Sequence, residues 1–294
     1  RRHTRCLSDW SSDVCSSDLI LCGISAVIMY SRAAQPQQKS SVITQAINDK
    51  NTPMVIKNLI LKMKEQMEVN DDQFPELIKE VENYTNSLAD SASVAVLHSM
   101  LAEMYQNYYQ RNQWTINQRT QLSGYIPEDI RVWTSNLFTD KIKEEIDLSL
   151  RPTALLQNTP VSKFKDILEI GKDSQTLRPT LYEFLAFRAL DIQPTVQIYK
   201  DLIAFQNKEP NMKSVLLTEL DYLRFLYGDK RDKESFEAYM NALDELYRNL
   251  ASQNYATEIL IAKLDLVSGS MFRYVSTQWD SIKAEEVKLC EEGI

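Results

Sequence analysis

The chain has 294 residues, a formal net charge of −8 and 44% hydrophobic residues. An acidic chain without a cluster of lysines and arginines is repelled by phosphate backbones, which argues against nucleic acid as a partner. Without its first 34 residues about 260 remain, enough for a sizeable core or an elongated helical array.

Residues 1–19 do not read as part of a folded protein. The segment RRHTRCLSDWSSDVCSSDL repeats Ser-Ser-Asp and has neither a helical nor an alternating apolar period. It resembles a translated sequencing-adapter read, so we expect it to be foreign to the protein. The alternative is a disordered polar leader, which would also lie outside the folded part of the protein.

Residues 20–34 are typical of the hydrophobic region and cleavage site of a signal peptide. The apolar run LILCGISAVIMY has about a dozen residues, fewer than the ~20 that a membrane span needs. Small residues within Ser31–Ala34 offer a cleavage site. The position of Cys22 inside the run argues against lipidation. We therefore expect export to the periplasm, the outer membrane or the cell envelope.

Residues 35–294 are predicted to be all-helical. The whole chain has six glycines, too few for a protein built from β-hairpins. Apolar residues recur every three or four positions within 94–108, 216–227 and 236–250, as on the buried face of an amphipathic helix. We predict an all-α fold in which antiparallel helix hairpins stack into an irregular α-solenoid. It resembles a tetratricopeptide array but lacks the strict 34-residue repeat.

Prolines and glycines predict where these helices begin and end. Proline is expected at the first helical position, where its missing N–H costs nothing, at residues 53, 127, 160, 179 and 194. The helix containing 94–108 is expected to end near Asn112. The next is expected to start at Pro127, with Glu128 and Asp129 in its first turn, where acid complements the helix dipole. Gly228 and Gly269 are expected just beyond helix ends.

The C-terminal segment EEVKLCEEGI looks like an interrupted helix, so we expect the chain to be a fragment that continues beyond residue 294. Once the first 34 residues are set aside, Cys290 is the sole cysteine. We therefore expect no intrachain disulfide in the mature segment. Cys290 is interpreted as a half-buried helical residue rather than a nucleophile.

Residues able to do chemistry are few. His98, the one histidine of the mature segment, is interpreted as a helix-packing residue beside Leu97 and Leu101. Adjacent carboxylates such as Glu144 and Glu145 are interpreted as solvated, since neighbours on a helix project about 100° apart. Zinc would need more His or Cys ligands, and no phosphate-loop, nucleophile-elbow or zinc-protease motif occurs. We predict a non-enzymatic chain that binds neither metal nor cofactor.

An aromatic group lies in the segment from Tyr105 to Trp114. It could form a stacking platform for sugars or a groove for a partner peptide, but packing into the core is the favoured interpretation, with hydroxyls at the rim. The candidate interaction surface consists of Tyr105, Tyr109, Trp114 and Arg119.

Several long strings resemble a known family. They are L-x-S-x-L-A-E-x-Y at Leu97–Tyr105, Tyr109, Arg111-Asn112-x-Trp114, Gln118-Arg119-Thr120, the acidic turn leading to Trp133 and Phe138, the helix end at Ser149-Leu150, Thr159-Pro160 before Phe164 and Ile167-Leu168, and RPTLYEFLAFRAL at Arg178–Leu190. In order and spacing they resemble the helical N-terminal region of the very large alpha-2-macroglobulin-like proteins of Bacteroidetes-type bacteria. The similarity covers about residues 92–192.

The resemblance implies a secreted or envelope-anchored protease inhibitor of well over a thousand residues. In that family a protease cleaves a bait segment, the macroglobulin domains rearrange and the protease is entrapped; some members add a Cys–Gln thioester. Those parts would lie downstream, so target proteases are implied partners through domains absent here. No functional residue of the family maps onto this chain.

Two other interpretations stay open. The first is an exported helical glycan-binding or transport-accessory protein, or a general protein-interaction scaffold, motivated by the aromatic group around Tyr105–Trp114. The second is an enzyme complete within these residues, which the scarcity of catalytic side chains disfavours.

Overall fold

The structure, a computed structural model, describes residues 52–69, 73–120, 126–168, 173–208, 211–228, 232–270, 287–288 and 291. The expectations for residues 1–19 and 20–34 and for Cys290 lie outside these residues. The chain divides into two compact units, residues 1–193 and 194–294, which are described separately.

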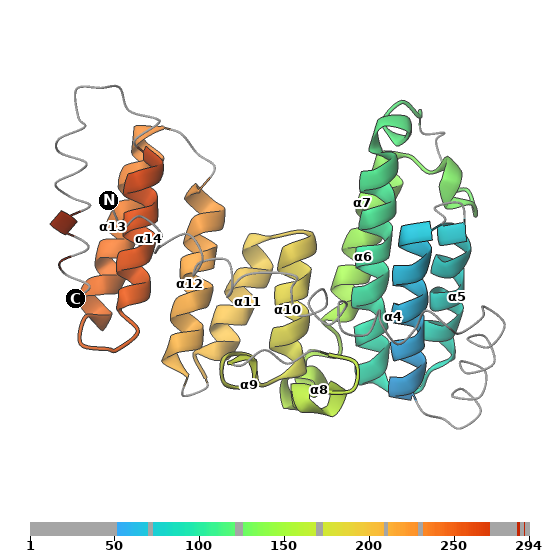
Figure 1. Ribbon diagram of the computed structural model, residues 1–294, viewed down its shortest axis with the longest axis horizontal. Helices are drawn as coiled ribbons and strands as arrows, with labels where there is room; N and C mark the ends of the chain where they lie inside the picture. The colour runs from blue at the N-terminus through green and yellow to red at the C-terminus, as the bar shows by residue number, and fades with distance from the viewer. Residues whose placement is uncertain are drawn as a thin grey trace, which may run out of the picture. The chain divides into compact units, whose positions relative to one another are not determined.

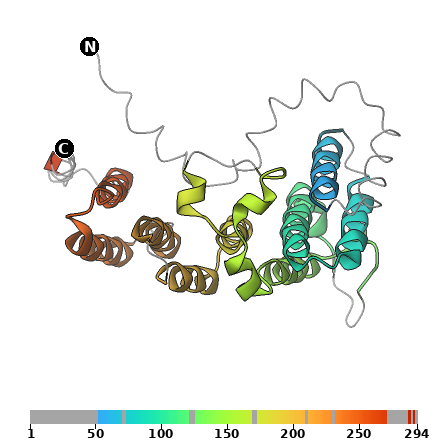
Figure 2. The same cartoon turned by 90° about the horizontal axis from the view of Figure 1, so that it is seen from below.

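In chain order, the helices of the first unit are α4 (Thr52–Val69), α5 (Phe74–Ser87), α6 (Ser91–Ile116), the 3₁₀ helix η2 (Ile130–Val132), α7 (Ser135–Ser149), α8 (Thr153–Asn158), the 3₁₀ helix η3 (Val161–Phe164), α9 (Ser174–Leu177) and α10 (Leu181–Ile192). The longer helices of the first unit, α4 to α7 and α10, run side by side, and the short α8 and α9 lie across them (Figures 1 and 2).

Helix α6 lies at the centre of this unit, in contact with α4, α5, α7 and α10. The expected stripe is buried at Leu97, Leu101, Met104 and Tyr108. Burial extends around the helix, to residues such as Ala95 and Met100, because neighbours cover several of its sides. The prediction of one buried face was therefore too narrow.

The second unit contains α11 (Val196–Gln206), α12 (Met212–Tyr227), α13 (Lys233–Leu250) and α14 (Thr257–Ser270). Each helix packs on the next, and α12 also contacts α14. Leu216, Leu220, Tyr239, Leu243 and Ile259 form the core, so the predicted apolar faces of α12 and α13 meet each other. Connections of a few residues between packed neighbours make these helices antiparallel hairpins.

The all-α prediction is confirmed. Across the described residues there is no strand, and the one β contact is an isolated bridge between Pro160 and Thr180. Helix–helix packing therefore supplies the core of each unit.

The predicted helix start at Pro127 is wrong: helix α6 continues to Ile116, and α7 begins only at Ser135. Between them the backbone is held by side chains. Asp129 accepts the Arg131 N–H at 2.9 Å and caps η2, and the Trp133 indole donates to the Pro127 carbonyl at 2.6 Å. Because Trp133 turns into the core, the backbone there is extended and a continuous helix from Pro127 is impossible.

The other prolines lie at helix starts, though not always at the expected position. Pro53 and Pro75 fall in the first turns of α4 and α5, whereas Pro160 is the residue before η3. Pro179 and Pro194 each precede a threonine that caps α10 or α11. Thr180 forms a full capping box with Glu183. The side-chain cap, not the proline, therefore satisfies the first N–H groups there.

Of the two glycines predicted just beyond helix ends, Gly228 lies there, directly after α12, and Gly269 does not. Gly228 is the capping residue of α12, but its φ of −59° is right-handed. What favours glycine there is space, because a Cβ would lie 2.5 Å from the Arg224 carbonyl oxygen. Gly269 lies inside α14 and does not end it.

Candidate functional site

The structure separates the four residues of the predicted interaction surface. Tyr105 is 1% exposed, with its ring 5.7 Å from that of Trp133, so it cannot belong to an exposed surface. Tyr109 is half-buried, and its hydroxyl donates to Asn117 Oδ1 at 3.2 Å. Arg119 donates to the Trp133 carbonyl at 2.7 Å. Trp114 alone of the four stands in solvent, 79% exposed.

Tyr105 is drawn inward because α5, α6 and α7 meet around it. Its ring also lies 6.5 Å from that of Phe138. Its hydroxyl donates to Glu82 Oε1 at 2.7 Å, so the polar end of the side chain is satisfied inside the unit. The favoured interpretation of Tyr105 as a core residue agrees with this placement, although its hydroxyl bonds to a neighbouring helix instead of reaching the rim.

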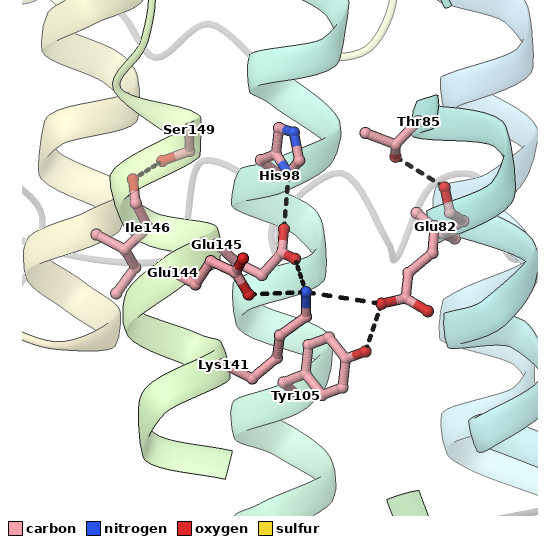
Figure 3. Close-up of polar contacts among 10 residues, drawn as sticks. Glu82, Thr85, His98, Tyr105, Lys141, Glu144, Glu145, Ile146 and Ser149 are labelled. Carbon is pink, nitrogen blue, oxygen red and sulfur yellow. Dashed lines mark hydrogen bonds and ion pairs between the residues drawn. The ribbon is translucent and has the colours of Figure 1, made fainter. Parts of the chain in front are cut away.

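A charge network joins α6 to α7 (Figure 3). Glu145 on α7 is 2% exposed, with Oε2 lying 2.6 Å from His98 Nδ1 and Oε1 lying 2.8 Å from Lys141 Nζ. Lys141 also lies 3.0 Å from Glu144 and 3.9 Å from Glu82. The network therefore continues to Tyr105 through the shared partner Glu82.

The interpretation of Glu144 and Glu145 as a solvated pair is therefore half wrong. Glu144 faces solvent, with 58% of its side chain exposed. Glu145 lies in the buried stripe of α7, three residues after Ile142 and seven after Phe138. Helical periodicity would have placed it there, because that spacing returns to the same face.

The surroundings of Glu145 keep it ionised. Burial acts to raise the pKa of this carboxyl, but hydrogen bonds and charge from His98 and Lys141 outweigh burial and lower the pKa. Since an ionised carboxylate can only accept, the Nδ1 atom of His98 must carry the proton that it shares with Glu145.

The pKa values of Lys141 and Tyr105 are both raised. Burial acts to lower the pKa of Lys141, but hydrogen bonds and charge from Glu145 and Glu144 outweigh burial and raise the pKa. Burial, together with the bond to Glu82, raises the pKa of the Tyr105 phenol, so that it stays protonated and donates. The network is thus stable in one protonation state, with Lys141 charged and Tyr105 neutral.

A carboxylate bonded to histidine Nδ1 is also found in catalytic triads, where a nucleophilic hydroxyl or thiol bonds to Nε2 of the same histidine. Nε2 of His98 points away from Glu145 (Figure 3). Ser99, its sequence neighbour, instead has its Oγ 2.9 Å from Arg188 Nε on α10. Ser149 donates to the Ile146 carbonyl at 2.7 Å, which directs it back to its own helix. Ser99 and Ser149 are therefore both engaged in packing contacts.

Sequence reasoning missed a second polar contact, between α6 and α10. Arg188 donates through Nε to Ser99 and through Nη2 to Glu103 Oε2, at 2.9 and 2.7 Å. Gln106 Nε2 donates to the Ile192 carbonyl at 3.0 Å, closer to the end of α10. Ser99, Glu103 and Gln106 follow one another at four and three residues on α6, a spacing that could have identified a polar face turned toward a partner helix.

The chain segments before η3 and α10 are also paired. The Val161 N–H donates to the Pro179 carbonyl at 2.9 Å, and the Leu181 N–H donates to the Thr159 carbonyl at 2.8 Å. Thr159-Pro160 and Pro179-Thr180 are therefore fixed against each other, and the start of α10 is held in place.

The fold and these contacts define an all-α protein of packed helix hairpins whose first unit is tied together by buried charged groups. Comparisons of the chain with protein-family models, with curated proteins and with solved structures found no match. Among the described residues, no helix is both long and apolar enough to cross a membrane. In the same part of the chain, no three His, Cys, Asp or Glu side chains gather so that they could hold a metal ion.

Proposed function

We propose that this chain is a non-catalytic helical module of an exported alpha-2-macroglobulin-like protein, whose protease-trapping domains lie downstream. The resemblance over residues 92–192 motivates the proposal, and its strings contact each other in space. Leu97–Tyr105 meets Arg178–Leu190 through the bonds from Arg188 to Ser99 and Glu103. Two of the strings that carry the resemblance therefore pack against each other, which supports the proposal that they belong to one scaffold.

The charge network also supports a scaffold role. Both oxygens of Glu145 have partners on α6 or α7, and Tyr105 is committed to Glu82. Groups bound this way fix the register of α6 against α7 and leave few donors or acceptors for a substrate. On this proposal the module positions domains or recognises a protein, and chemistry belongs elsewhere in the full protein.

The test is the full-length gene product. Its downstream sequence should encode a series of β-rich macroglobulin domains. The purified protein, incubated with a panel of endopeptidases, should leave cleavage of a small chromogenic peptide intact while suppressing cleavage of casein, as a physical trap does. A gene without such domains, or equal loss of both activities, would overturn the proposal.

One observation favours a second candidate, glycan binding: Trp114 is 79% exposed at the end of α6. An exposed indole can stack on a sugar ring. Because Tyr105 is buried, it cannot belong to the stacking platform for sugars that the sequence suggested. Binding on a glycan array that disappears in Trp114→Ala would support this candidate, and an array without hits would exclude it.

A further inference from the structure

The second unit contains an open groove formed by three consecutive helices. Its lining residues come from α11 with the following Asn207, from α12 and from α13, and in Figure 2 α12 is offset between the other two helices. We call the α12 side of the groove the floor and the α11 and α13 sides the walls. The groove measures about 530 Å³, within the range of pockets that hold small ligands or short peptide segments. The small side chains of Ala204 and Ala242 on the two walls keep it open.

The floor carries a carboxylate that the fold does not use. Glu219 on α12 is half-buried, and within the described part of the chain it forms no hydrogen bond and no ion pair. Its pKa is raised, and burial is the cause. Buried Glu145 and Glu183 differ, because the first binds His98 and Lys141 and the second closes a capping box.

An unpaired, partly desolvated carboxylate opposes folding. Glu219 is not part of the hydrophobic core of this unit, to which α12 contributes Leu216 and Leu220. Residues that reduce stability and make no compensating contact within the fold are expected at functional sites. Glu219 therefore marks the groove as a place where a cation is expected from outside.

The groove contains further polar side chains. Glu245, on the α13 wall, adds a second carboxylate, and neither it nor Glu219 is paired with Lys200, the groove's one lysine, which is exposed on α11. Asn207 and Asn249 stand on opposite walls, each near the end of its helix. A carboxamide both donates and accepts, as a peptide backbone requires.

We propose that this groove binds an extended peptide segment through a lysine or arginine side chain, whose cation pairs with Glu219 on the floor. Asn207 and Asn249 bond the peptide backbone, and apolar neighbours of the basic residue rest on Leu223 and Leu246. The partner is thus a protein with an accessible basic strand. The inference rests on the groove alone and holds whether or not the chain belongs to a macroglobulin-like protein.

Three fluorescein-labelled pools of capped heptapeptides test the proposal, each with mixed neutral neighbours and a fixed central residue: lysine, norleucine or glutamate. Anisotropy titrations use the full chain. The lysine pool should bind, with the other two weaker by on the order of tenfold or more, the value of one charge-assisted contact. Equal binding of the lysine and norleucine pools, or no binding of the lysine pool, overturns the proposal.

Glu219→Gln should weaken the lysine pool by on the order of tenfold. The matched control is Glu234→Gln, which removes an exposed carboxylate of α13 outside the groove and should leave binding unchanged. Ala204→Trp, on an exposed wall position, should block the groove while retaining the carboxylate. If Glu219→Gln does not fold, Ala204→Trp decides alone. Tight binding of n-butylamine equal to that of the lysine pool would overturn a peptide partner in favour of a small amine.

Discussion

Arg188 donates through Nε to Ser99 Oγ across 2.9 Å, although the two residues are 89 positions apart in the chain. The same guanidinium holds Glu103 one turn further along α6, so a single side chain from α10 spans two positions of the central helix. Because guanidinium geometry is rigid and its donors are forked, this contact fixes both the distance and the register of α10 on α6.

Replacing Arg188 by alanine should lower the free energy of unfolding by about 2 kcal/mol, since the change leaves Ser99 and Glu103 without their donor. Arg188→Lys should recover only part of the loss, because one ammonium cannot reproduce the fork. Urea denaturation followed by circular dichroism measures both. Arg131→Ala is the control: this arginine pairs with Glu76 at the surface, and its removal should shift the midpoint little. Equal shifts for Arg188→Ala and Arg131→Ala would contradict the register role.

Glu145→Gln should destabilise the protein at neutral pH by about 3 kcal/mol, because it leaves His98 and Lys141 with a weaker partner in a buried setting. The lowered pKa of Glu145 fixes the pH dependence. Its contribution is present above the ordinary carboxyl pKa of about 4.3 and is lost as pH falls through the lower folded value. The stability gap between wild type and variant should therefore narrow on acidification. Urea titrations at several pH values measure this gap, and Glu144→Gln, on the exposed neighbour, should open no comparable gap.

The contribution of Lys141 to stability should be lost at alkaline pH, whereas that of Glu145 is lost at acidic pH. The raised pKa of Lys141 means that its stabilising contribution is complete below the ordinary lysine pKa of about 10.4 and disappears as pH rises through the folded value. Lys141→Met should thus be less stable than wild type at pH 7 and should converge with it at strongly alkaline pH. Lys143→Met changes an exposed lysine of the same helix and should track wild type throughout. Thermal melts across pH 7 to 11 distinguish the two variants.

Some of this arrangement could be read from the sequence. The all-α class follows from scarce glycine and three-four apolar spacing. The start of α10 was readable too, because Thr180 and Glu183 stand at the spacing of a capping box. The burial of Glu145 was readable from its position on the stripe of Ile142 and Phe138, although charge made it look solvated.

Other features depend on contacts between distant segments, and local patterns cannot supply them. The stretch after Pro127 carries proline and acid like a helix start. Packing of Trp133 against Tyr105 instead holds that backbone extended. The partners of Arg188 follow from how α10 docks on α6. Likewise, the groove that contains Glu219 needs three helices in place before its floor exists.

Truncating the two tryptophans of the described α6–α7 region should change stability by very different amounts. Trp133 is 8% exposed, stacks on Tyr105 and donates to the Pro127 carbonyl, so Trp133→Ala should cost about 3–4 kcal/mol. Trp114→Ala removes a side chain that is 79% exposed and should leave stability within about 0.5 kcal/mol of wild type. Chemical denaturation measures both. A large loss for Trp114→Ala would show that its indole packs against the protein.

Glu219→Gln should raise stability at neutral pH, by about 1 kcal/mol, because it removes a partly desolvated charge that has no partner in the described chain. The sign is opposite to that of Glu145. Because the folded pKa is raised, the penalty on folding is complete above that folded value, fades as pH falls through it, and is gone below the ordinary carboxyl pKa of about 4.3. The advantage of the variant over wild type should thus shrink on acidification, as differential scanning calorimetry at pH 7 and pH 4 would measure. Glu234→Gln should show no such advantage. A variant less stable than wild type at pH 7 would mean that Glu219 has a structural partner and that the groove floor is part of the fold rather than a site kept for a cation.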